Sequence, residues 1–313
     1  MPEFVERQLT FADQILNISI NQLMRRSVVM ATEPLYGVTV KDVDQTLDYI
    51  LAHHSSVARF GDGEIDLIAG RNIPYQSYDP ALVEHLKRVL YTPSRPELVV
   101  CMSDVFERLE RYTPAAQAFW AQNRSANAAI YQLMGANVDW YGSTFISRPY
   151  MDWQDKRLAQ GYFAKLRQLW ADRDVLIVEG QLSRSGVGND LFANAKSVQR
   201  ILGPAHNAFA QYAALKAAIE KFGPGKLVLL MLGPTAKALV GELAATGLQL
   251  VDIGHIDSEY EWFQMGATSK VKLQHKHTAE HNFDEDITLT AAPEYEAQII
   301  ADLSQEGTQA HED

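Results

Sequence analysis

Two features of the sequence predict an α/β fold with a mainly parallel sheet flanked by helices. Short apolar runs of the kind that form strands alternate with stretches whose apolar residues recur every three or four positions, which is the rhythm of strand–helix–strand units. Polar, glycine-containing loops directly follow several of the apolar runs. In an open parallel sheet, ligands bind outside the carboxyl ends of the strands. The sequence therefore also predicts where a site lies.

Four apolar runs are the predicted strands, and each leads into a polar loop. The runs cover residues 56–60, 97–101, 174–179 and 227–232. The loops that follow are residues 61–64, residues 102–104, a Gly- and Ser-rich stretch and residues 233–235. We expect these loops to converge on one site.

Helices are predicted between the strands from apolar periodicity and from the residues that end them. They cover residues 80–90, 162–170, 208–222 and 235–246, and a further helix is expected through Leu191, Phe192 and Ala195. Glycines at positions 223 and 247 mark two of the helix ends, because glycine readily adopts the left-handed conformation that follows a helix.

The size and composition are those of a folded chain. The sequence has 313 residues, of which 47% are hydrophobic and 21% charged, far from the composition of disordered proteins. No repeat or Pro-rich linker marks a domain boundary, so one elaborated domain fits as well as two. The polar, acidic tail from about Gln298 is expected to be mobile.

Charge and cysteine content exclude several classes of protein. With 28 Lys and Arg against 39 Asp and Glu, the net charge is −11, which argues against a broad nucleic-acid surface. The single Cys101 can form neither an intramolecular disulfide nor a thiolate metal cage. Since no apolar run reaches the roughly 18 residues of a membrane span and no signal-peptide pattern is found, we expect a cytoplasmic protein.

The first 26 residues are expected to form an amphipathic helix. Apolar residues from Phe4 to Leu23 recur at mixed three- and four-residue spacings. Packing on the domain or on a sister subunit in a homo-oligomer is the favoured interpretation. Peripheral contact with a membrane is the alternative, and it is disfavoured because the polar face is not rich in Lys.

The motif Arg59-Phe-Gly-Asp-Gly-Glu64 is the first candidate site. Asp62 and Glu64 follow a predicted strand and are separated by a glycine, which lets a turn aim both carboxylates at one cation. Hard oxygen ligands suit Mg²⁺ or Mn²⁺. An ordinary Asp-Gly turn is the alternative. Arg59 is expected either to pair with a carboxylate or to bind a phosphate oxygen.

The second candidate is the loop Glu179-Gly-Gln-Leu-Ser-Arg-Ser-Gly-Val-Gly-Asn-Asp190. Its small residues expose backbone N–H groups and Arg184 adds positive charge, so Arg184, Ser185, Gly186 and Asn189 are predicted to form an anion cradle. A surface loop with helix-capping Asn189 or Asp190 is the alternative. The loop lacks the Lys of ATPase phosphate loops and the spacing of dinucleotide-binding loops. Gly233 and Thr235 form a weaker second cradle, unless Thr235 is only a helix cap.

The third candidate is Asp252-Ile-Gly-His-Ile-Asp-Ser-Glu-Tyr-Glu-Trp-Phe263. Its acids and aromatic rings are of the kind used for proton transfer and for contact with sugars. Glu259 and Asp257 are the candidate general bases, with His255 beside them. A fourth cluster, His275, His277 and His281, is interpreted as a solvated segment in preference to a zinc site.

Four blocks of this sequence resemble the GT-D type glycosyltransferases of bacteria. They are the Arg59–Glu64 motif, Phe145-Ile-Ser-Arg-Pro-Tyr150, residues 178–192, and residues 252–262. The similarity runs from about residue 47 to residue 278 and keeps the four blocks in order.

The resemblance implies a Rossmann-like domain and a nucleotide-diphosphate sugar donor, for which a UDP-sugar is favoured. Asp62 and Glu64 fall on the family's Asp-x-Glu motif, which engages the donor through Mn²⁺ or Mg²⁺. The acceptor is then a glycan or glycoprotein, in surface polysaccharide assembly or adhesin glycosylation. The expected organisation is an N-terminal helical extension (1–45), the transferase domain (46–284), and a C-terminal helix with a mobile acidic tail (285–313).

With such a donor, the anion cradle is expected to contact phosphate or ribose. Glu259 or Asp257 would deprotonate the acceptor hydroxyl if the reaction inverts the configuration at the anomeric carbon. Two other functions use the same residues. A metal-assisted phosphoesterase or nucleotide-sugar hydrolase would use water as acceptor, and an inactive module would bind UDP without turnover.

Overall fold

The computed structural model describes residues 34–281 and 287–305, and its centre is one sheet of eight strands. The strands lie in the order β3-β2-β1-β7-β6-β4-β5-β8, and all neighbouring pairs run parallel. Their bounds are β1 Ser56–Phe60, β2 Leu98–Met102, β3 Gly142–Ser143, β4 Asp174–Gly180, β5 Ser197–Gly203, β6 Leu227–Met231, β7 Gln249–Asp252 and β8 Ile299–Asp302. The predicted α/β class with a mainly parallel sheet is confirmed.

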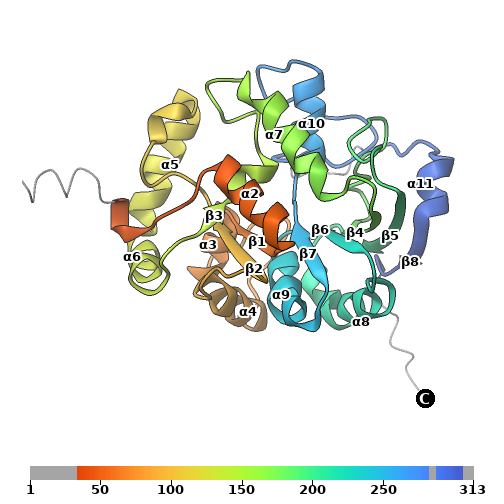
Figure 1. Cartoon of the computed structure of the whole chain (residues 1–313), viewed down its shortest axis with the longest axis horizontal. Helices are drawn as coiled ribbons and strands as arrows, with labels where there is room; N and C mark the ends of the chain where they lie inside the picture. The colour runs from red at the N-terminus through yellow and green to blue at the C-terminus, as the bar shows by residue number, and fades with distance from the viewer. Residues whose placement is uncertain (1–33, 282–286, 306–313) are drawn as a thin grey trace, which may run out of the picture.

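Helices cover both faces of the sheet (Figure 1). The α-helices are α2 Val43–His53, α3 Asp62–Ile68, α4 Pro80–Leu90, α5 Pro114–Ala126, α6 Ala128–Asn137, α7 Leu158–Leu166, α8 Tyr212–Phe222, α9 Pro234–Leu243, α10 Ile256–Gln264 and α11 Pro293–Gln298. Short 3-10 helices are Leu35–Gly37, Leu109–Arg111, Thr144–Ser147, Arg167–Leu169, Ala208–Gln211 and Ala244–Thr246. On one face α4 and α8 pack against α9, which lies on β1 and β7, while α2 and α7 pack together on the other.

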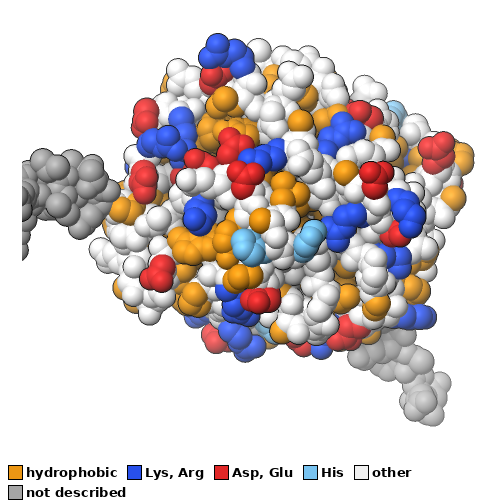
Figure 2. Space-filling model, viewed as in Figure 1, with side chains coloured by type: hydrophobic (Ala, Val, Ile, Leu, Met, Phe, Trp, Pro, Cys, Tyr) orange, Lys and Arg blue, Asp and Glu red, His pale blue; other side chains and the backbone are white. Residues whose placement is uncertain are grey.

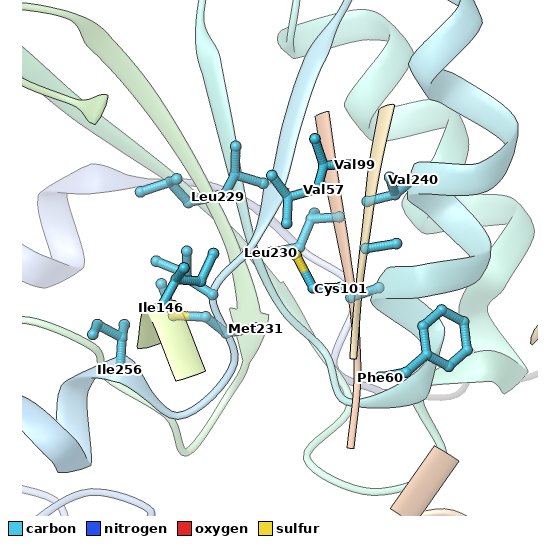
Figure 3. Packing of buried hydrophobic residues seen from close by; sticks show 14 of the residues in the cluster. Val57, Phe60, Val99, Cys101, Ile146, Leu229, Leu230, Met231, Val240 and Ile256 are labelled. Atoms are coloured by element: carbon cyan, nitrogen blue, oxygen red, sulfur yellow. The ribbon is translucent and has the colours of Figure 1, made fainter. Parts of the chain in front are cut away.

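The core fills the two spaces between the sheet and its helices (Figure 3). Phe60 and Val240 lie on one side of the sheet, and Ile146 and Ile256 lie on the other. All four side chains are fully buried. Each such side chain contributes about 1.5 to 3 kcal/mol through removal of apolar surface from water, so the sheet is held rigidly under the loops at its carboxyl edge.

The four predicted strands are present as β1, β2, β4 and β6, whereas the sequence did not predict β3, β5, β7 and β8. The predicted helices mostly agree with the structure, and the main differences are as follows. Residues 189–195 form turns instead of a helix, because Asn189 Oδ1 accepts from Leu191 N at 3.0 Å and so supports a local turn. The helix expected at 162–170 is α7 followed by a 3-10 turn that ends at Leu169. The segment from His275 is not fully solvated, since Lys276 and Thr278 are buried.

The C-terminal region also differs from the expectation. α11 is the expected C-terminal helix, but Ile299–Asp302, predicted to be part of a mobile tail, form β8 and pair with β5. The expected domain boundary at residue 284 therefore leaves a strand of this sheet outside the domain. The amphipathic helix expected in residues 1–26 and the acidic end of the chain lie outside the described residues.

Charged side chains of both signs are interspersed on the face seen in Figure 2. No basic surface of the kind that binds nucleic acid covers that face. Among the described helices, none has the length and apolar character needed to cross a bilayer.

Candidate functional site

The loops after four adjacent strands surround a cavity of about 360 Å³. Its walls include Asp62 after β1, Ser183 after β4, Gly233 after β6 and His255 after β7. Ser103, which follows β2, also lines it. The predicted convergence of these loops on one site is confirmed.

The floor of the cavity is a buried ionic cluster centred on Asp252. Arg59 donates from Nε to the Asp252 carbonyl at 2.7 Å, and its guanidinium lies 3.2 Å from Asp252 Oδ1. Lys237 Nζ lies 3.0 Å from Asp252 Oδ2. Burial disfavours the charged carboxylate, yet the two cations hold the pKa of Asp252 below its usual value. Arg59 is thus committed to a carboxylate, which is one of its two expected roles.

Glu64 is part of the same cluster. Its Oε2 accepts from Gly61 N at 2.8 Å, and its Oε1 lies 2.9 Å from Lys237 Nζ. The motif lies in the first turn of α3, with Asp62 as the first helical residue. Side chains two apart on a helix do not face each other, so Glu64 points toward Lys237 while Asp62 has a different direction.

Asp62 is the carboxylate of this motif that the protein leaves available. Among the described residues, no hydrogen bond or ion pair joins its side chain to another residue, whereas the neighbouring Asp66 pairs with Arg71. Burial in the cavity wall raises the pKa of Asp62, Arg148 opposes this, and Glu280 and Glu64 raise it further. A cation beside Asp62 would remove this repulsion.

Arg148 and Glu280 form the edge of the cavity as an ion pair. Arg148 also lies 3.9 Å from Asp152. Its charge lowers the pKa of Glu280. Arg148 belongs to the block Phe145–Tyr150, one of the four blocks that carry the resemblance. The structure places the Arg148 side chain at the cavity.

Two histidines, His255 and His277, lie close together in the wall of the cavity. The ring centroids of His255 and His277 are 5.8 Å apart, and both residues line the cavity. Burial, and then the charge of Arg148, lower the pKa of His255 well below 6.5. His255 is therefore an unprotonated imidazole at neutral pH. The described residues contain no group of three or more His, Cys, Asp or Glu that could hold a metal by themselves.

The Gly- and Ser-rich loop does form an anion cradle, but a carboxylate of this chain occupies it. Gly186 N donates to Asp257 Oδ1 at 2.7 Å, and Asn189 Nδ2 donates to the same oxygen at 2.9 Å. Lys276 Nζ lies 2.8 Å from Asp257 Oδ2. None of these four residues lines the cavity.

Arg184 and Ser185 are likewise engaged within the protein. Arg184 donates to the Thr290 carbonyl at 2.7 Å, and Ser185 N donates to Glu179 Oε2 at 2.9 Å. Neither residue is part of the cavity wall. These positions give no support to the predicted contact of Arg184 and Ser185 with phosphate or ribose, which stays a prediction.

Glu259 lies behind the cavity wall. Its Oε2 accepts from Tyr150 N at 3.0 Å and from Met151 N at 2.9 Å, so it holds the end of the block that carries Arg148. Complete burial raises the pKa of Glu259 to about 7, against the influence of Arg148. Glu259 and Asp257 are absent from the cavity lining, and a general-base role for either stays a prediction.

Of the two residues predicted to form the weaker cradle, only Gly233 lies at the cavity. Gly233 is the N-cap of α9 and lines the cavity. Thr235 is fully buried, is not the N-cap, and does not line the cavity.

Among the cavity residues discussed above, sequence reasoning missed Lys237, Tyr75 and Glu280. Lys237 lies inside the sequence of a helix, and Tyr75 lies in a loop without a motif. None of these residues gives a local sequence signal, since its place at the cavity depends on residues distant in the chain.

Comparison with known proteins gives one family. A family model for the glycosyltransferase GT-D fold matches residues 57–281. The probable glycosyl transferase Gly of Streptococcus gordonii is 55% identical over 86% of this chain. Glycosyltransferase GlyD of Streptococcus pneumoniae serotype 4 is 51% identical over 87% of this chain. The matched region is 39% of the first relative and 33% of the second, so the chain spans little more than a third of these relatives.

A solved structure has the same fold over nearly its whole length. It is described as a new glycosyltransferase (DUF1792) from Streptococcus sanguinis, and it is 53% identical to this chain with a TM-score of 0.83. The match covers 85% of this chain and 99% of that chain.

Proposed function

The chain belongs to the glycosyltransferase GT-D fold family, and from this we propose that it transfers a sugar from a nucleoside-diphosphate donor to an acceptor hydroxyl with the help of Mn²⁺ or Mg²⁺. A UDP-sugar is the donor we propose, and a glycan or glycoprotein is the acceptor.

The unpaired Asp62 in an acid-rich cavity is the observation that carries this proposal. The cavity lining has four acidic and three basic side chains: Asp62, Glu64, Asp66 and Glu280 against Arg59, Arg148 and Lys237. Each of these cations already contacts a carboxylate. An anionic diphosphate would meet net negative charge here, so a divalent cation must enter with it.

The donor set fits such a cation. Mg²⁺ and Mn²⁺ prefer oxygen ligands, and Mg²⁺ commonly uses one or two carboxylates while water and substrate phosphates complete its shell. Asp62 would supply the free carboxylate. Glu64 keeps lone pairs beyond its bonds to Gly61 and Lys237. When bound, the cation would stabilise the negative charge that develops on the departing diphosphate.

The side chains around the cavity have separate tasks in this proposal. A phosphate can replace Glu280 as the partner of the Arg148 guanidinium, because carboxylates and phosphates both accept two parallel hydrogen bonds from arginine. Arg59 and Lys237 keep Asp252 charged, and Lys237 also holds Glu64 in place through an ion pair. His255 lies at the cavity wall beside His277, and we propose it as the proton acceptor for the acceptor hydroxyl.

Calorimetry tests the proposal directly. We expect UDP to bind the full chain in Mn²⁺, to lose affinity with chelator, and to bind better than GDP or CMP. Asp62→Asn should abolish the metal-dependent part of binding. Asp44→Asn is the matched control, since Asp44 is exposed on α2 and pairs with Lys165. UDP binding that ignores both Mn²⁺ and Asp62→Asn would contradict the proposal.

Product analysis separates transfer from hydrolysis. The proposal predicts that sugar release from a UDP-sugar depends on an added acceptor. Release at an unchanged rate without acceptor would instead indicate a nucleotide-sugar hydrolase.

A further inference from the structure

Tyr75 lies between the two turns that bring helix N-termini to the cavity. A Cβ added to Gly63, in the first turn of α3, would lie 3.2 Å from Tyr75 Oη. A Cβ added to Gly233, the N-cap of α9, would lie 3.1 Å from the ring atom Cε2. The ring meets His255 edge-on, with centroids 6.4 Å apart. Both glycines leave room for this phenol, and any larger residue would press on it.

The loop that carries Tyr75 is fixed from the other half of the sheet. Ile73 and Gln76 pair as an isolated β-bridge. Asn207, after β5, donates from its backbone N to the Tyr75 carbonyl at 2.9 Å, and its Oδ1 accepts from Ser77 N at 2.8 Å. The loop that carries the phenol is therefore held by hydrogen bonds that do not involve the Tyr75 hydroxyl.

The Tyr75 hydroxyl is left for a ligand. In the described part of the chain, no hydrogen bond uses Tyr75 Oη, although it lies over the Asp62–Glu64 turn. A phenol is protonated at neutral pH and can donate one hydrogen bond. Helix N-termini attract anions, and the N-terminus of α9, capped by Gly233, lies beside the Tyr75 ring. A diphosphate oxygen is the acceptor that fits this position.

We infer that Tyr75 is a catalytic residue whose hydroxyl donates a hydrogen bond to the departing β-phosphate of the donor. This inference rests on the proposed nucleotide-sugar transfer. The contact becomes stronger as the bond from sugar to phosphate breaks, because negative charge then accumulates on the phosphate oxygens. The anomeric carbon forms a bond to the acceptor oxygen, whose proton passes to His255, the proposed base. The bond from the anomeric carbon to the phosphate oxygen breaks, its electron pair stays on the diphosphate, and Tyr75 keeps its proton.

Tyr75→Phe tests the hydroxyl alone, because the ring contacts with Gly233 and His255 remain. With Mn²⁺ present, we expect UDP affinity to fall about tenfold and UMP affinity to stay the same, since UMP has no β-phosphate. The kcat for transfer should fall about 100-fold. Tyr78→Phe is the matched control, because Tyr78 is exposed and lies outside the cavity lining.

The outcomes are distinguishable. Unchanged UDP affinity and kcat in a folded Tyr75→Phe variant would overturn the inference and leave the proposed function intact. Equal losses for UDP and UMP would also overturn it, because a displaced loop weakens both nucleotides. A wild-type protein that binds neither nucleotide would overturn the proposed function and this inference together.

Discussion

Two glycine-containing turns follow β1 and β4 of the same sheet, and only the turn after β1 has a carboxylate without a partner among the described residues. The turn after β1 leaves Asp62 unpaired at the cavity, while the loop after β4 encloses Asp257 with Gly186 N, Asn189 and Lys276. Both have the small residues and charges of a ligand-binding loop.

The difference shows that small and charged residues in a loop can predict an anion-binding site. They do not predict whether the anion is a ligand or a side chain of the same protein. In the loop after β4, the anion belongs to α10, so the cradle joins two parts of the protein. In the turn after β1, the carboxylate of Asp62 lacks a partner among the described residues, which is why we propose an external cation there. Substitutions in the first region should therefore change activity, and those in the second should change stability.

Asp62→Asn should have the largest effect. It removes the free carboxylate, and we expect kcat for metal-dependent transfer to fall about 1000-fold, the upper end for one charge-stabilising contact. The melting temperature should not fall, because a carboxylate with a raised pKa is already costly in the folded state. Steady-state kinetics and thermal melts of the same sample check this. Full activity in the folded variant would remove the distinction between the two turns.

Lys276→Met should destabilise the second region by about 3 to 5 kcal/mol. It leaves Asp257 and Glu261 buried or half-buried without their cation, which is the usual cost of breaking a buried ion pair. Urea unfolding gives the free energy, and UDP calorimetry on the folded variant should return the wild-type affinity. Normal stability combined with lost UDP binding would show that the cradle serves a ligand after all.

Glu259→Gln should change how stability depends on pH. The pKa of Glu259 is raised from 4.5 to about 7 in the folded state, so its contribution is fully present below pH 4.5 and is lost as pH rises toward and through 7. The shift corresponds to about 3 kcal/mol. Relative to wild type, the Gln variant should therefore gain about that much between pH 4.5 and pH 8. Urea unfolding of both proteins across this range gives the difference, and a constant difference would contradict it.

Gly186→Ala and Gly188→Ala should have the smallest effects on stability. Comparing the two variants separates the cost of backbone strain from the cost of steric contact with Phe192. Both glycines have positive φ, of 82° and 83°, and a Cβ at Gly186 would lie 2.7 Å from a Phe192 ring carbon while Gly188 has open space. We expect a loss of about 1 kcal/mol at Gly188 and at least about 2 at Gly186. Neither variant should alter UDP affinity, and equal losses of stability would show that Phe192 yields freely.

Much of the fold follows from local sequence. The apolar runs at β1, β2, β4 and β6 identify four of the strands because all of their residues except Asp174 are buried. β5 escaped prediction because it carries Arg200, whose burial is explained only by the ion pair with Glu179 on β4. A strand whose polar residue is neutralised by a neighbouring strand has no signal of its own.

The candidate site was predictable to the same limit. Asp62 and Glu64 stand out because two acids and two glycines are adjacent in the chain. Tyr75 and Lys237 could not be found, since their place at the cavity depends on Asn207 and Asp252 from distant segments. For the same reason the sequence did not show that Asp257 fills the cradle at Gly186.

The position of β7 has a consequence for how the chain acquires its sheet during synthesis. β7 lies between β1 and β6, so it joins the strands β3-β2-β1 to the group β6-β4-β5, to whose edge β8 is added later in the chain. Until residues 249–252 emerge from the ribosome, β1 and β6 each present an unpaired edge, and such edges favour pairing with other chains. Joining the two groups of strands is thus a long-range step, which makes folding slow, and it is also the step that brings His255 to the cavity.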